Sequence, residues 1–196
     1  MLGGFGKLWL AAALLLFVSA CAELRYSHLH PDAKDFQPNK VLILPAEVAA
    51  YGEARGVVDR IVASVLIERG WFAEVVAGED LERRMTSNAE LRNAVVEYLS
   101  KLNSLSFSDP GMSRRIASLA GVDSLLAVNV DMWNYAKEKD DKFAKVGLGV
   151  RLIAADSGTI LWRAGDLATE KYRVIRPELS DVARSLVKKI MDYLPR

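Results

Sequence analysis

The sequence has 196 residues, of which 51% are hydrophobic and 26% charged, and its formal net charge is +1. This composition is typical of a globular chain that buries a core, and the near-zero charge excludes the basic excess expected of a nucleic-acid-binding protein. The single cysteine, Cys21, excludes an internal disulfide and a multi-cysteine zinc site. The length predicts one domain, with or without an extension.

Residues 1–20 are predicted to be a signal peptide. Lys7 supplies a positive start, residues 8–18 form an apolar run, and small residues follow it. A spanning helix needs about 20 apolar residues, so this run is too short to be one. Cleavage is expected between Ala20 and Cys21.

Cys21 could be a core residue, a reactive thiol, a metal ligand or an attachment point. The stretch "VSAC" that ends at this cysteine resembles the lipobox of bacterial lipoproteins. The resemblance implies that the thiol receives a diacylglycerol, that the signal peptide is cut before Cys21, and that the new amine is acylated. Ala22, which replaces the aspartate that retains such proteins at the inner membrane, then implies the outer membrane. The alternative is an ordinary signal peptide that leaves a free thiol.

Residues 21–39 are predicted to be the lipidated cysteine and a flexible tether, because the stretch has two prolines and little periodicity. It contains both histidines, His28 and His30, which would share a face if the chain were extended. That spacing occurs in some metal sites, but no further histidine is available. A solvated linker is therefore the favoured interpretation, and we expect no metal site.

Residues 40–196 are predicted to form a single α/β domain. The unbroken apolar run 41–46 favours a central strand buried on both faces. Apolar residues then recur at helical spacing from Val57 up to Gly70, which can end a helix in a left-handed conformation. A short second strand is expected at 72–77.

Two helical stretches follow this strand. Ser87 and Glu90 have the spacing of a capping box, which predicts a helix that continues to about residue 104. The stretch 88–109 is interpreted as a helical insertion. A shorter helix is expected to end at Gly121.

From residue 122 the hydrophobic period changes to two, which predicts an antiparallel meander of three long strands. The last two strands are joined by a tight turn at 156–159. A helix that begins near Pro177 closes the chain. The sequence therefore predicts an α/β (α+β) fold of two layers, in which helices pack on one face of a mixed sheet and the meander leaves the other face partly open.

Catalytic motifs are absent from the sequence. It has no G-x-S-x-G, no P-loop and no G-x-G-x-x-G, and the glycines at 147 and 149 lie inside a predicted strand. No histidine lies in the predicted domain, which removes the commonest general base. Asp123 and Asp131 are the candidates for a carboxylate enzyme, but nothing pairs them. We expect no enzyme, no catalytic residues and no cofactor.

The mixed face of the meander is the remaining candidate for function. Tryptophan and arginine are enriched in interface hot spots, so this face is predicted either to be a contact surface or to be merely solvated. The candidate interaction surface comprises Asn129, Asp131, Trp133, Arg151 and Trp162.

Five stretches, in order, resemble a known group of proteins. They are "KVLILPA" from Lys40, "LIERGWFAEVV", "EDLERRM", "ASLAGVDSLLAVNV" and "DSGTILWRA". The set is similar to the envelope lipoproteins related to CsgG, LpoB, PelC and the GNA-type lipoproteins, whose domain resembles the amino-terminal domain of TolB. The resemblance extends to about Ala168. The charged run at 138–142 departs from the membrane-spanning hairpins of the curli protein, so a pore made by this chain alone is not expected.

The resemblance implies a non-enzymatic periplasmic lipoprotein at the outer membrane, held there by its lipid. The main hypothesis is an accessory or scaffold factor that binds a partner or itself in envelope assembly or secretion. The alternative is a ring subunit of a polysaccharide or protein secretion system. A second alternative is a carboxylate hydrolase that acts on the cell wall.

Overall fold

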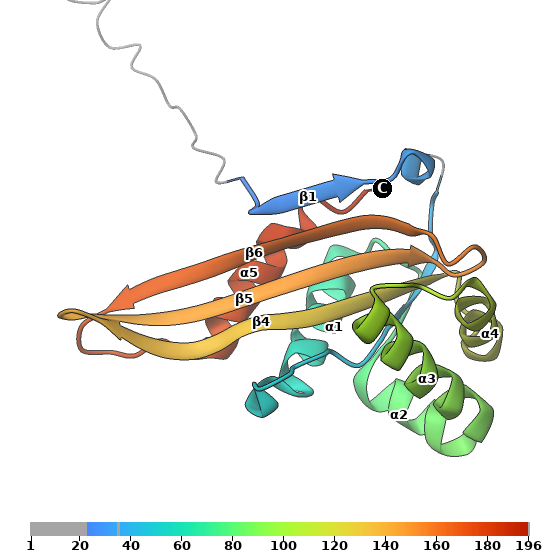
Figure 1. Cartoon of the computed structure of the whole chain (residues 1–196), viewed down its shortest axis with the longest axis horizontal. Helices are drawn as coiled ribbons and strands as arrows, with labels where there is room; N and C mark the ends of the chain where they lie inside the picture. Colours follow the sequence, from blue (N-terminus) through green and yellow to red (C-terminus); the bar gives the residue numbers. More distant parts are fainter. Residues whose placement is uncertain (1–22, 35, 196) are drawn as a thin grey trace, which may run out of the picture.

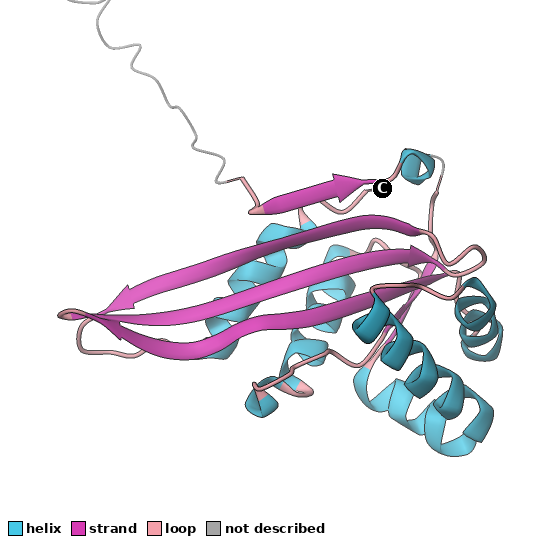
Figure 2. Cartoon of the chain, viewed as in Figure 1, coloured by secondary structure: helices cyan, strands magenta, loops and turns pink. Residues whose placement is uncertain are grey.

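The computed structural model describes residues 23–34 and 36–195. Its centre is a six-stranded mixed sheet in the order β1-β6-β5-β4-β2-β3 (Figures 1 and 2). The strands are β1 (Tyr26–Leu29), β2 (Lys40–Ile43), β3 (Glu74–Val76), β4 (Ser124–Glu138), β5 (Asp141–Ala154) and β6 (Ile160–Tyr172). β2 pairs with β3 and β4 in parallel, and the remaining pairs are antiparallel. The predicted mixed sheet with an antiparallel meander is confirmed.

Five α-helices accompany the sheet in the described part of the chain. They are α1 (Val57–Arg69), α2 (Gly78–Ser87), α3 (Ala89–Leu105), α4 (Pro110–Ala120) and α5 (Leu179–Met191). α1 ends as predicted at Gly70, which has a φ of 62°. α3 differs from prediction at its start, because Ser87 ends α2 and the side chain of Asn88 accepts hydrogen bonds from Glu90 N and Leu91 N. Asn88, rather than Ser87, is the cap.

The helices lie on both faces of the sheet, which differs from the expected single covered face. α1 and α5 pack on one face against residues such as Leu126, Val128 and Leu148. The opposite face carries a second core over its β2 end, where α2, α3 and α4 cover Leu42 and Leu125. Only the part of this second face that lies over β4, β5 and β6, beyond α3, is left uncovered (Figure 1). We call that part the open face.

A β-bulge in β4 changes which side chains reach the open face. Val130 pairs with Leu148 and Met132 pairs with Gly147, so Asp131 is an extra residue without a partner. An extra residue shifts the alternation by one position. Trp133 therefore lies on the same side as Val130, in the core beneath α5, and Met132 lies on the open face.

Part of the predicted tether belongs to the sheet. Residues Tyr26–Leu29 form β1, which pairs with β6, and a 3-10 helix, η1 (Pro31–Lys34), follows it. Leu24 is buried in the core, and the indole nitrogen of Trp162 donates to Ser27 Oγ at 3.1 Å. The prediction of a flexible linker is wrong for this stretch, since it supplies an edge strand.

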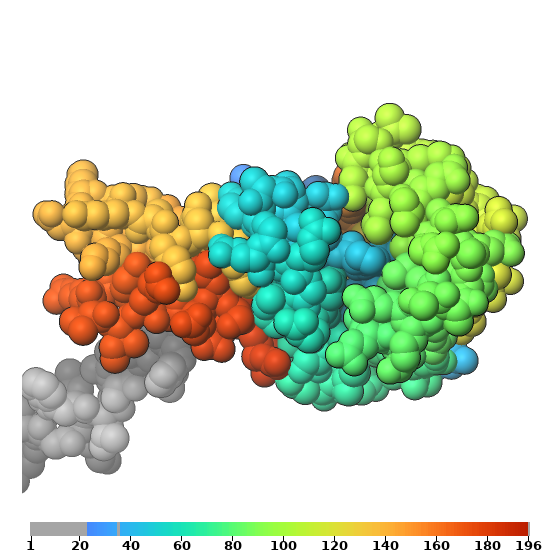
Figure 3. All heavy atoms as spheres, turned by 90° about the horizontal axis from the view of Figure 1, so that it is seen from below, coloured from blue at the N-terminus to red at the C-terminus, as the bar shows by residue number. Residues whose placement is uncertain are grey.

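The long strands continue beyond the helices as an arm. Figure 3 shows the far ends of β4, β5 and β6 projecting from the body of the molecule. The loop that follows β6 at this tip exposes Val174 and Ile175, at 92% and 85% of their surfaces. Two fully exposed branched side chains in sequence are a candidate contact point.

Candidate functional site

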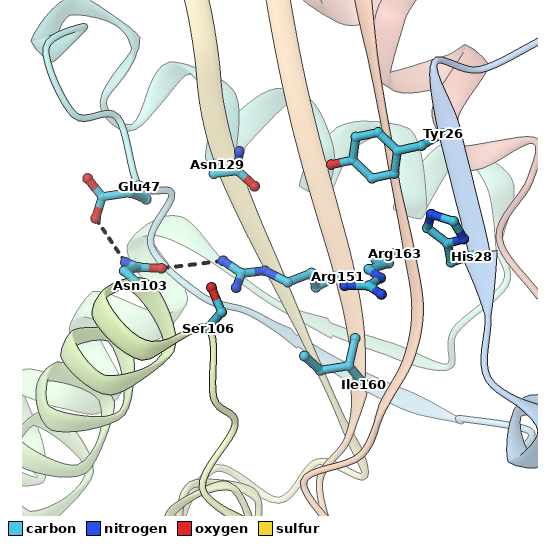
Figure 4. A pocket seen from close by; sticks show the side chains of 9 residues that line it. All are labelled: Tyr26, His28, Glu47, Asn103, Ser106, Asn129, Arg151, Ile160 and Arg163. Atoms are coloured by element: carbon cyan, nitrogen blue, oxygen red, sulfur yellow. Dashed lines mark hydrogen bonds between the residues drawn. The ribbon is translucent and has the colours of Figure 1, made fainter.

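A polar groove of about 560 Å³ lies on the open face, between β1 and the carboxyl end of α3. We call it the open-face groove (Figure 4). Its lining comes from separate parts of the chain. Tyr26 and His28 lie on β1, Glu47 lies in the loop after β2, and Asn103 and Ser106 lie at the end of α3. The long strands supply Asn129, Arg151, Ile160 and Arg163. Ile160 is the one aliphatic residue in this set, so the groove suits a hydrophilic ligand.

Two paired glycines lie beneath two of the side chains that line the groove. The register places Asn129, Gly149, Gly165 and Tyr26 side by side across four strands. A Cβ at Gly149 would lie 2.5 Å from Asn129 Oδ1, and a Cβ at Gly165 would lie 2.6 Å from the Tyr26 ring. The Asn129 and Tyr26 side chains therefore lie over the two glycines, which explains why this row of the sheet needs residues without a Cβ.

The next row across the sheet carries the positive charge. Arg151 pairs directly with Arg163, and Arg163 pairs with His28. Arg151 donates only to two neutral oxygens, Leu102 O and Asn103 Oδ1, both at 3.4 Å. Its Nε is buried with no hydrogen-bond partner. Within the described residues no carboxylate forms an ion pair with Arg151 or Arg163.

The two carboxylates near these arginines are bonded to amides instead. Glu47 accepts from Asn103 Nδ2 at 2.8 Å, and Asp131 accepts from Asn129 Nδ2 at 2.5 Å. Figure 4 shows the first of these bonds, which leads from Glu47 through Asn103 to the Arg151 guanidinium. The acidic side chains therefore orient the amides of the groove, keep their negative charge, and form no ion pair with the two arginines.

The electrostatics of the groove follow from burial. Burial lowers the pKa of the Arg151 guanidinium, although it remains far above neutral pH, and the Tyr98 and Tyr26 side chains oppose this effect. Burial is also the main cause of the raised pKa of Tyr26, and Asp131 adds to it. Tyr26 is therefore a neutral hydroxyl at physiological pH and can donate a hydrogen bond.

The predicted contact residues are divided between two faces. Asn129 and Arg151 line the groove, and Asp131 lies beside it, bonded to Asn129. Trp133 and Trp162 are 5% and 1% exposed and lie in the core under α1 and α5. Their assignment to the contact surface is wrong, for Trp133 because of the bulge at Asp131.

Sequence reasoning missed several residues of the groove. Arg163 could not be placed from the predicted turn at 156–159, because a second bulge, at Leu161, shifts the pairing of β5 with β6 by one residue. Tyr26 and His28 lie two residues apart in a strand that the linker interpretation overlooked. Glu47 and Asn103 carry no signal in the sequence, since a backbone bridge to Asn129 places Glu47 and the packing of α3 places Asn103.

The other chemical candidates have structural roles or lie elsewhere. The Asp123 carboxylate accepts from the backbone nitrogens of Asn39 and Lys40 at 3.0 and 3.1 Å, which ties the start of β2 to β4. His30 accepts from the Asp32 nitrogen. Over residues 23–34 and 36–195 there is no cluster of three or more potential metal ligands, nor a helix long and apolar enough to span a membrane.

The signal peptide, the cleavage site at Ala20 and the lipidation site Cys21 lie outside the described residues. The lipobox therefore stays a prediction from the sequence.

Known protein families and curated sequences give no match to this chain. Solved structures do: a PelC dodecamer from Paraburkholderia phytofirmans superimposes with a TM-score of 0.57 and 19% identity, over 87% of this chain and 96% of PelC. The chain has the fold of PelC. Lipoprotein GNA1162 from Neisseria meningitidis superimposes with a TM-score of 0.56 and 16% identity, over 79% of this chain and 96% of GNA1162. The hypothetical protein CT253 from Chlamydia trachomatis superimposes with a TM-score of 0.52 and 9% identity, over 79% of this chain and 94% of CT253. At these identities the likeness establishes the fold.

Proposed function

We propose that this protein is a non-enzymatic lipoprotein, anchored by acylated Cys21 to the periplasmic face of the outer membrane, that assembles with copies of itself as part of an export or assembly machine of the envelope. The observation that carries the proposal is the PelC fold, which covers 96% of a chain that forms dodecamers. The likeness to a second lipoprotein, GNA1162, supports an envelope role.

The sequence of the amino end supports the anchor. Ser19 and Ala20 before Cys21 fit a lipoprotein peptidase, and several acyl chains at about 0.8 kcal/mol per buried methylene would hold the protein firmly on a membrane. β1 begins at Tyr26, so the body of the protein would lie within a few residues of the bilayer. The short connection favours a fixed position over a long reach.

Acylation is tested by expressing the full chain in a Gram-negative host and measuring the mass of its first mature peptide. We expect a diacylglyceryl and an acyl group on Cys21, and we expect Cys21→Ser to leave the membrane fraction. Ala22→Asp is the matched control, because it keeps the cysteine and is expected to move the protein to the inner membrane. An unmodified Cys21 in a mature protein cut after Ala20 would contradict the anchor.

Self-association is tested on the acylated protein in detergent. A closed ring needs a heterologous contact between two different patches of one chain. We expect a discrete oligomer of high order by native mass spectrometry. A monomer at high concentration would instead favour the second candidate, an accessory factor that binds a different envelope protein through its open face.

A further inference from the structure

The arginines of the open-face groove stand in contrast to the other buried or half-buried arginines of the fold. Arg84 bonds Glu74 and Asp80 at 2.9 and 3.0 Å, and Arg184 bonds Glu68 at 2.8 Å. Arg151 is equally enclosed but has two long contacts to neutral oxygens, and its Nε has no acceptor. A buried donor without an acceptor is unfavourable unless something else supplies one.

The pairing of Arg151 with Arg163 across two strands adds to the unfavourable energy of this unpartnered donor. Like charges directly opposite each other on two antiparallel strands repel, and Arg151 and Arg163 occupy such positions on β5 and β6. Glu47 and Asp131 accept hydrogen bonds from Asn103 and Asn129, and among the described residues neither forms an ion pair with these arginines. The two guanidinium groups therefore lie on neighbouring strands with no carboxylate paired to either in the described part of the chain.

We infer that the open-face groove binds the carboxylate or phosphate group of a hydrophilic ligand, with Arg151 and Arg163 as its principal contacts. Guanidinium groups suit this role, because their planar fork of donors matches the oxygens of such groups. The groove holds about 560 Å³, which is much larger than one oxyanion, so the charged group is part of a larger molecule.

The remaining lining supplies contacts for the rest of that molecule. The Tyr26 hydroxyl points into the groove (Figure 4), and its ring stacks on His28 with centroids 6.2 Å apart and planes inclined by 24°. Asn103 and Ser106 at the end of α3 add polar groups on the opposite wall. Ile160 is the one aliphatic residue of the lining, which favours a soluble anion over the acyl chains of a phospholipid.

The test uses the folded protein with inorganic phosphate and glucuronate as probes, measured by the shift of amide resonances and by calorimetry. A third arm measures sedimentation with phosphatidylglycerol vesicles. Each arginine that contacts the anion should strengthen binding by about tenfold or more. We therefore expect saturable binding of at least one soluble probe, and a loss of about tenfold in Arg163→Gln and in Arg151→Gln.

Arg92→Gln is the matched control, because Arg92 is exposed near the start of α3 and away from the groove. It should bind like the unaltered protein. Arg163 is exposed, so its variant folds even if Arg151→Gln does not. Arg151→Lys provides a second variant at the buried position, which keeps the charge but loses the fork and should also bind more weakly.

Three results would overturn the inference. The first is the absence of saturable binding by both phosphate and glucuronate. The second is an equal loss in Arg92→Gln, which would mean unspecific attraction by surface charge. The third is binding to the vesicles alone, which would assign the arginines to a lipid headgroup.

Discussion

Trp133 is the residue at which the bulge in β4 has the largest measurable effect. If β4 alternated regularly, Trp133 would lie on the open face beside Asn129, and its truncation would leave the fold intact. With Asp131 as an extra residue, the indole is 5% exposed and packs in the core beneath α5. Replacing a buried tryptophan by alanine costs about 3–5 kcal/mol, since it removes apolar contacts and leaves a cavity.

For a domain of this size each kcal/mol shifts the unfolding midpoint by about 2–4 °C, so Trp133→Ala should lower it by roughly 6–20 °C. The assay is thermal unfolding followed by circular dichroism at 222 nm. Asp131→Ala is the comparison, because Asp131 is exposed, and it should change stability by no more than about 0.5 kcal/mol. A shift below about 2 °C in Trp133→Ala would refute the buried position and with it the bulged register.

Three further changes test the local structure. Asn88→Ala should lower the free energy of unfolding by about 1 kcal/mol in a urea titration, because it removes the cap of α3, and Ser87→Ala should have a much smaller effect. A larger effect in Ser87→Ala than in Asn88→Ala would instead support the predicted capping box. Gly165→Ala would place a methyl group 2.6 Å from the Tyr26 ring and should displace β1, seen as faster amide exchange over residues 26–29; unchanged exchange would contradict the packing of the ring on the glycine. Burial raises the pKa of Asp59 above its ordinary value of 3.8, which hydrogen bonds from the backbone only partly offset. The folded state then binds the proton more tightly, so the contribution of this carboxyl is complete below pH 3.8 and is lost as the pH rises through the folded pKa. Asp59→Asn, which does not ionise, should gain stability relative to the unaltered protein between about pH 4 and 7. A difference in unfolding free energy that does not change with pH would contradict the raised pKa of Asp59.

Much of the fold could be predicted because local signals and packing agree. Gly70 ends α1 where the apolar spacing stops, and β5 and β6 pair as an antiparallel hairpin across the predicted turn at 156–159. Residues 41–44 of the apolar run at 41–46 are buried on both faces as predicted, and this requires helices on both sides of the sheet. The prediction that helices cover only one face of the sheet conflicts with that pattern.

The bulge could not be predicted, because both possible registers fit the pattern. Met132 and Trp133 are both apolar, so the alternation looks regular whichever of them faces the core. β1 escaped detection for a different reason. It is a four-residue edge strand with mostly exposed side chains, and such a strand carries no hydrophobic period.

Only two of the nine residues that line the groove could be predicted from the sequence. Asn129 and Arg151 follow from the alternation of β4 and β5, whereas Arg163 lies opposite Arg151 because of the bulge at Leu161. The two walls depend on tertiary packing, one from the docking of β1 on β6 and the other from α3. That packing encloses Arg151 and leaves its Nε without an acceptor.

The central proposal is that this chain is an acylated envelope lipoprotein that assembles with itself, as the PelC chains of the same fold do. Native mass spectrometry of the full chain, extracted from bacterial membranes in mild detergent, tests both parts in one measurement. We predict a discrete oligomer of high order, whose released subunits begin at Cys21 and carry the mass of three acyl chains. A soluble monomer with an unmodified Cys21 would contradict the proposal.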